Sequence, residues 1–87
     1  MELKKQVRDF VTANFYVADP ASLEDRASLL DDGIVDSTGV LEVIGFIEST
    51  FGVTVEDSEM LPENLDSIER IAAFVARKTS RPESVAA

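Results

Sequence analysis

The sequence predicts an all-α fold, a bundle of three longer helices and one short helix with a long loop between the first and second. Three stretches carry apolar residues at helical spacing, whereas Val53-Thr54-Val55 alternates like a strand but is too short, and lacks a partner run, to form a sheet. The 87 residues suffice for one domain with a modest core, and a hydrophobic fraction of 45% is too high for a disordered chain.

The first helix is expected over residues 2–16, on an apolar stripe that consists of Leu3, Val7, Phe10, Val11 and Phe15. Pro20 ends this pattern. Residues 17–36 form a long connection, and its apolar residues indicate that it packs over the core: Leu23, Leu29, Leu30, Ile34 and Val35. Loops of this length are uncommon in compact domains and are often functional. Gly33 suits a turn directly before the next helix.

The second helix is expected from Ser37 to about Phe51. Asp36 is suited to cap it, because a carboxylate can accept bonds from the free backbone N–H groups of the first turn and lies favourably at the positive end of the helix dipole. Gly52 is suited to stop the helix. The buried face of the helix is predicted to consist of Val40, Val43, Ile44, Ile47 and Phe51.

A short helical turn is expected near residues 57–61, closed by Pro62. The last helix is expected to begin near Asp66, because the spacing of Asp66 to Glu69 resembles a capping box. Its core stripe is predicted to consist of Ile68, Ile71, Ala72 and Val75.

The net charge of −9 is unevenly distributed. Residues 31–69 contain eleven acids and no Lys or Arg, and the rest of the chain has six acids and eight bases. Such a field repels nucleic acid and anionic membranes and attracts basic protein surfaces, although acids can equally serve only to keep a surface solvated. No apolar run approaches the roughly 20 residues needed to span a bilayer, and the first residues lack the apolar core of a signal peptide. We therefore expect a cytoplasmic monomer.

The pair Asp36-Ser37 places a serine hydroxyl at a helix N-terminus, at the end of a long loop. Such a position favours an attached phosphate, because free N–H groups and the helix dipole stabilise negative charge. Capping alone would also select Asp-Ser at a helix start, so the dipeptide by itself leaves both readings open.

The wider sequence resembles the acyl carrier protein family, in which Asp-Ser-Leu opens the second helix. The similarity includes the leading amphipathic helix and these stretches: Leu29-Leu30 with Gly33, Asp36-Ser37, Val40-Leu41-Glu42-Val43-Ile44, Phe51-Gly52-Val53 and Asp66-Ser67-Ile68. The resemblance implies a carrier domain over residues 1–79, and we expect residues 80–87 to be a frayed tail.

The resemblance also implies that Ser37 is not a catalyst but anchors a 4′-phosphopantetheine arm taken from coenzyme A, with Asp36 as the cap beside it. Acyl or aminoacyl groups would be held on the thiol of the arm as thioesters. The absence of Cys agrees with this, since the sulfur would come with the arm. The implied partners are a magnesium-using phosphopantetheinyl transferase, an adenylate-forming acyl or aminoacyl ligase, and acyltransferases or synthases with basic surface patches.

The family recognises its partners through the second helix and nearby acids. The candidates here are Leu41, Glu42, Gly45, Glu48, Glu56, Asp57 and Glu59. For Leu41, peripheral packing is an equally good explanation, and for the acids the alternative is helix solubility.

The sequence departs from the family pattern at Thr38 and Gly39, where Leu and an acid are usual. With a glycine at this position, the sequence resembles D-alanyl carrier proteins and other stand-alone carriers. This resemblance favours a specialised biosynthetic pathway over housekeeping fatty-acid synthesis. Gly39 costs about 1 kcal/mol relative to Ala in a helix. Close approach of a partner and packing against the loop both remain as reasons for it, and Gly39→Asp together with Thr38→Leu is expected to stabilise the helix slightly.

Three other functional classes compete with a carrier protein. An enzyme with Ser37 as nucleophile would need a base, but the chain has no His and no Gly-x-Ser-x-Gly motif. An acidic interaction module without a prosthetic group remains an alternative. Calcium binding by Asp31, Asp32 and Asp36 does not fit the spacing of an EF-hand loop, and no metal site is predicted.

Overall fold

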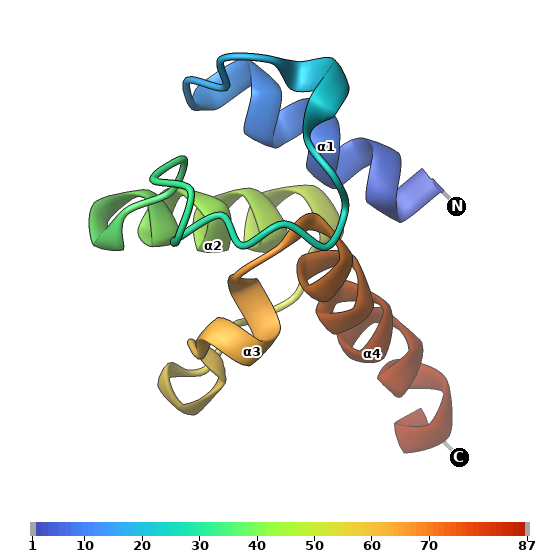
Figure 1. Cartoon of the computed structure of the whole chain (residues 1–87). Coiled ribbons are helices and arrows are strands. Elements are labelled where there is room, and N and C mark those ends of the chain that lie inside the picture. Colours follow the sequence, from blue (N-terminus) through green and yellow to red (C-terminus); the bar gives the residue numbers. More distant parts are fainter. Residues whose placement is uncertain (1, 87) are drawn as a thin grey trace.

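The computed structural model describes residues 2–86, and the side chains of residues 3–79. Its elements are α1 (Glu2–Asn14), η1 (Pro20–Ser22), α2 (Ser37–Phe51), η2 (Asp57–Glu59), α3 (Pro62–Leu65) and α4 (Ile68–Ala86), where η marks a single 3-10 turn. There is no strand in this part of the chain. The predicted all-α bundle, with three longer helices, one short helix and a long loop between α1 and α2, is confirmed (Figure 1).

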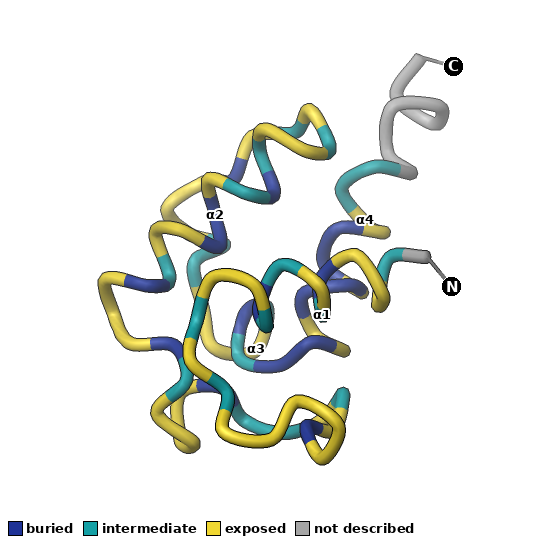
Figure 2. The backbone as a smooth tube through the Cα atoms, turned by 90° about the horizontal axis from the view of Figure 1, so that it is seen from above, coloured by how far each residue is buried: buried dark blue, intermediate teal, exposed yellow. Residues whose placement is uncertain are grey.

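The core is built from the predicted apolar faces of the three longer helices. Both α1 and α3 pack on α4, and α2 also contacts α4 (Figure 1). Figure 2 shows buried positions along each of these helices. The fully buried side chains of the predicted faces are Val7, Val11, Val43, Ile47, Ile68, Ile71 and Val75. Phe74 is also buried, although the predicted stripe omitted it. Because α4 has a neighbour on three sides, its buried face is wider than one stripe.

A row of aromatic rings closes the seam between α1 and α2. Phe10 and Phe46 stack with their centroids 4.2 Å apart, and Phe15 and Phe51 meet them edge-on. Phe46 lies off the predicted core face of α2. Its stacking on α1 accounts for that position, since the ring covers the edge of the bundle.

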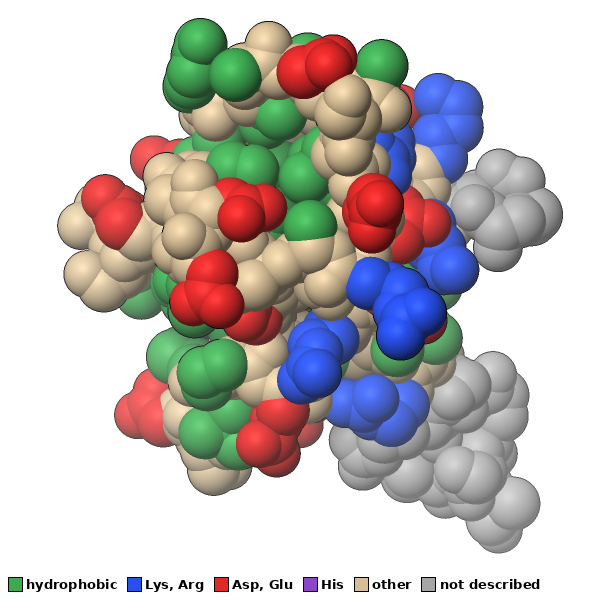
Figure 3. All heavy atoms as spheres, in the orientation of Figure 1, with side chains coloured by type: hydrophobic (Ala, Val, Ile, Leu, Met, Phe, Trp, Pro, Cys, Tyr) green, Lys and Arg blue, Asp and Glu red, His purple; other side chains and the backbone are tan. Residues whose placement is uncertain are grey.

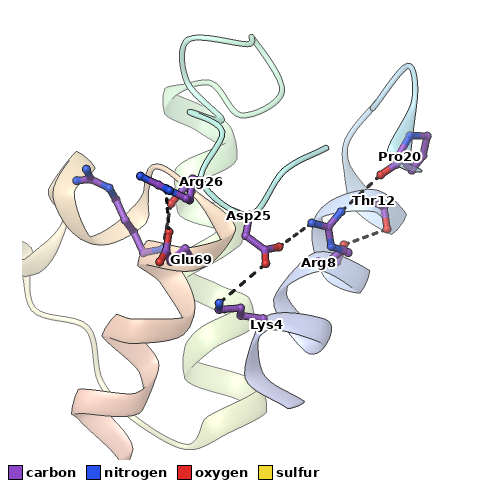
Figure 4. Close-up of polar contacts among 9 residues, drawn as sticks. Lys4, Arg8, Thr12, Pro20, Asp25, Arg26 and Glu69 are labelled. Carbon is purple, nitrogen blue, oxygen red and sulfur yellow. Dashed lines mark hydrogen bonds and ion pairs between the residues drawn. The ribbon is translucent and has the colours of Figure 1, made fainter. Parts of the chain in front are cut away.

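The long connection packs over the core as predicted, with Leu23, Leu29 and Val35 buried. Gly33 adopts a φ of +73°, so the expected turn is present. Asp25 ties this connection to α1, because its carboxylate accepts a bond from Arg8 at 2.6 Å (Figure 4). The carbonyl oxygen of Asp25 accepts a bond from the backbone N–H of Glu69 at 2.8 Å, which ties the same residue to α4.

Two details of the expected helix starts are wrong, the role of Pro62 and the cap of the last helix. Pro62 begins α3 instead of closing a turn, because proline needs no hydrogen-bond acceptor at the first position of a helix. The last helix begins at Ile68, and its cap is the buried Ser67, whose hydroxyl accepts a bond from the backbone N–H of Arg70 at 3.0 Å. The carboxylate of Asp66 is turned toward the long connection instead.

The first helix ends earlier than predicted, and the predicted bound of the domain near the C-terminus stays untested. The first helix stops at Asn14, two residues short of the expected end. The backbone of α4 is helical to Ala86. Side chains from residue 80 onward lie outside the described residues, so the boundary between domain and tail stays a prediction. No helix of the described part is long and apolar enough to cross a membrane.

Candidate functional site

The first turn of α2 is organised by its capping residue. Asp36 has an extended backbone, and its Oδ1 accepts a bond from the N–H of Gly39 at 2.7 Å. The predicted cap is therefore confirmed. Ser37 follows as the first helical residue and is exposed. The N–H groups of Ser37 and Thr38 have no acceptor within the helix, because they belong to its first turn. This arrangement favours a negative group near the Ser37 hydroxyl.

An apolar groove of about 200 Å³ lies beside this serine. Its lining comes from the long connection, from α2 and from the segment around α3: Leu30, Ser37, Val40, Met60, Leu61, Pro62 and Leu65. Ser37 is the one residue of this lining with a polar side chain. The sequence did not predict the groove, because its walls come together only through tertiary packing.

Gly39 is buried, and packing within the fold explains why this position holds a glycine. A Cβ atom built on Gly39 would come within 2.8 Å of Cε1 of Phe15 and 3.2 Å of Cγ1 of Val35. The first turn of α2 therefore packs closely against the ring of Phe15, and an added Cβ would require that ring to shift. This contact opposes the expected stabilisation by Gly39→Asp, because the added side chain would have to displace the ring. Gly45 is exposed, with open space where its Cβ would be.

Five of the candidate partner-binding residues lie at the surface. Leu41, one helical turn after Ser37, is a large apolar side chain that is 63% exposed. The others are exposed as well: Glu42, Gly45, Glu56 and Asp57. Among the described residues, Glu42 and Asp57 form no ion pair, so their charges face solvent.

Two candidate acids are engaged within the fold. Glu48 is half-buried, and its carboxylate accepts a bond from the backbone N–H of Val55 at 2.9 Å. Glu59 forms an ion pair with Lys78 of α4 at 2.9 Å, with the lysine side chain only 11% exposed, and also accepts a bond from the backbone N–H of Glu56. These contacts join the segment after α2 to its neighbours. A role for either acid in partner binding remains a prediction.

The charges are unevenly distributed over the surface. On the face shown in Figure 3, the basic side chains gather on one side, whereas acidic side chains spread over the rest of the face and also lie beside the bases. Several of the bases are paired with acids of the chain itself: Lys4, Lys5, Arg8, Arg26 and Lys78. Among the described side chains, those of residues 3–79, no three acidic groups come together as a metal site.

Known proteins place the chain in a family. An acyl carrier protein of Campylobacter hominis is 32% identical over 75 residues, which are 86% of this chain and 91% of that protein. The probable acyl carrier protein PigG of a Serratia species is 22% identical over 93% of each chain. A D-alanyl carrier protein of Abiotrophia defectiva is 30% identical over 61% of this chain and 67% of its own length. No family model matches the sequence. From the first of these relatives and from the fold, the chain belongs to the acyl carrier protein family, whose members are non-catalytic carriers.

Proposed function

We propose that this protein carries acyl or aminoacyl groups as thioesters on a 4′-phosphopantetheine arm attached to Ser37. The observation that carries the proposal is the position of Ser37 between a capped helix N-terminus and an apolar groove. The phosphate of the arm would lie by the first turn of α2, whose N–H groups favour negative charge. The arm would supply the thiol that the chain itself lacks, since the sequence contains no Cys.

The groove suits the apolar part of a cargo. Apart from Ser37, its lining has apolar side chains only. Its volume of about 200 Å³ is smaller than the roughly 300–1,000 Å³ of pockets that enclose drug-sized ligands. It therefore fits a short aliphatic segment that remains tethered at Ser37 rather than a whole ligand.

Partner enzymes would approach the same end of α2. Leu41 offers an exposed apolar contact, and Glu42 offers an unpaired negative charge one residue further along the helix. This combination suits a phosphopantetheinyl transferase, a ligase or a synthase that presents a basic surface around an apolar centre. Glu56 and Asp57 would extend the acidic rim.

We further propose that the pathway is specialised, and that a stand-alone adenylate-forming ligase loads the arm in the cytoplasm. The support is the exposed Thr38 directly after Ser37, where the family pattern has Leu, together with the similarity to a D-alanyl carrier protein. Gly39 no longer contributes to this argument, because Phe15 accounts for it. Housekeeping fatty-acid synthesis is the alternative.

Intact mass spectrometry tests the attachment site. Incubation with coenzyme A and a broad-specificity transferase should add one phosphopantetheine per chain, and Ser37→Ala should abolish the addition. The variant should stay folded, because Ser37 is exposed and makes little packing contact. Ser49→Ala is the matched control, since Ser49 is an exposed serine of the same helix. Undiminished labelling of Ser37→Ala would refute the assignment.

A further inference from the structure

The two walls of the groove beside Ser37 are joined at one residue, Asp66. One wall is Leu30 of the long connection, and the other comes from the segment around α3, which ends directly before Asp66. The N–H of Leu30 donates to Oδ1 of Asp66 at 2.9 Å, and the hydroxyl of Ser28 donates to Oδ2 at 2.7 Å. Both carboxylate oxygens therefore accept bonds from the long connection, one from Leu30 of the wall and one from Ser28 beside it.

The backbone and the side chain of Asp66 hold different parts of the connection. The carbonyl oxygen of Asp66 accepts a bond from the N–H of Leu29 at 2.7 Å, and this bond does not involve the side chain. Leu29 is fully buried and is the anchor of the loop, because its own carbonyl accepts bonds from Ile34 and Val35. Among the described residues, the carboxylate accepts bonds from Ser28 and Leu30 only.

Leu30 depends on that carboxylate more than its buried neighbour does. Its side chain is 37% exposed, and Leu61 across the groove is 40% exposed, so packing alone fixes neither firmly. We propose that Asp66 is a positioning residue: its carboxylate holds Leu30 against the α3 segment and thereby sets how far the groove opens to a group tethered at Ser37. This inference rests on the proposed function for the identity of that group.

Amide hydrogen exchange on the unmodified chain tests the wall directly. Asp66→Ala should accelerate exchange of the Leu30 N–H roughly tenfold or more, because a bond to a charged acceptor is lost, and should affect the Leu29 N–H less. Asp66→Asn should restore much of the protection, since its amide oxygen can still accept from Leu30. Ser28→Ala removes one of the two bonds, should give a smaller increase, and stands in if Asp66→Ala does not fold.

Asp25→Asn is the matched control. It weakens another half-buried carboxylate anchor of the same connection, but that anchor leads to Arg8 on α1 and not to the groove. The Leu30 N–H should therefore exchange as in the wild type. Equal Leu30 exchange in the wild type and Asp66→Ala would overturn the proposal, as would an increase of the same size in Asp25→Asn.

A second measurement uses butyryl and octanoyl groups, transferred with the arm from their coenzyme A thioesters onto Ser37. Cleavage by hydroxylamine should be slower than for the free acyl pantetheine, and Asp66→Ala should lose this protection severalfold while Asp66→Asn and Asp25→Asn keep most of it. Unchanged protection in Asp66→Ala would overturn the role toward cargo. If the wild type is not loaded, the proposed function fails, and if it is loaded but not protected, the groove is not a cargo site; in either case, accelerated Leu30 exchange in Asp66→Ala would still support Asp66 as the anchor of the wall.

Discussion

Two glycines of α2 differ in what an added methyl group would meet, and this difference gives a quantitative prediction. At Gly45 there is open space, so Gly45→Ala should stabilise the protein by about 1 kcal/mol through helix propensity alone. At Gly39 the same substitution brings a Cβ to 2.8 Å from Phe15 and 3.2 Å from Val35. Overpacking of this kind costs roughly 1–3 kcal/mol. Gly39→Ala should therefore be neutral to destabilising, by up to about 2 kcal/mol.

Thermal and urea unfolding monitored by circular dichroism measure both variants. In a domain of this size, 1 kcal/mol corresponds to roughly 4–8 °C in Tm, so Gly45→Ala should melt several degrees above the wild type and Gly39→Ala at or below it. A double-mutant cycle with Phe15→Ala isolates the contact. In the Phe15→Ala background, Gly39→Ala should recover most of the propensity gain, with a coupling of about 1–3 kcal/mol.

Stabilisation by Gly39→Ala equal to that by Gly45→Ala would refute the packing explanation, as would strict additivity with Phe15→Ala. In that case, the glycine would need a reason outside the fold, such as the close approach of a partner to the arm.

Two further predictions concern recognition. Glu42→Lys should slow loading by the cognate ligase without lowering Tm, and loading of the wild type should slow as salt rises, because screening shortens the reach of the acidic field. Glu24→Lys, at an exposed acid of the long connection, is the control. Loading that is insensitive to salt and unaffected by Glu42→Lys would contradict electrostatic steering. Thr38→Leu should impair loading by that ligase and should change the free energy of unfolding by no more than about 0.5 kcal/mol, as for other surface substitutions. A wild type that accepts malonyl groups and supports elongation as well as a housekeeping carrier does would refute the specialised pathway.

Local signals predicted the centre of the fold well. Asp36 and Gly52 delimit α2 as expected, because a carboxylate cap and a left-handed glycine each act on backbone within one turn. The capping residue of α4 was missed for a long-range reason. Asp66 and Ser67 are both residues that cap helices, and Asp66 is drawn away by Ser28 and Leu30, which lie more than 30 residues earlier.

The serine could be predicted from the sequence, but its surroundings could not. Asp36-Ser37 stands out in the chain, whereas the groove beside it needs Leu30 and Leu61 to meet across a tertiary interface. Likewise, the sequence left both packing and the approach of a partner open as reasons for Gly39, since the ring that packs against it belongs to Phe15, more than 20 residues earlier. Periodicity reports which face of a helix is buried and not which residue covers it.

The first turn of α2 divides its residues between the fold and the cargo. Asp36 is committed to the cap, Gly39 to the contact with Phe15, and Val40 to the wall of the groove. Ser37 and Thr38 are exposed between them, so a bulky group on the Ser37 hydroxyl displaces no core side chain. A carrier that presents different intermediates needs this separation, because its stability must not depend on what it carries. On the proposed function, the groove would be the place where cargo contacts the fold, and Asp66 would be the residue through which that contact reaches the rest of the bundle.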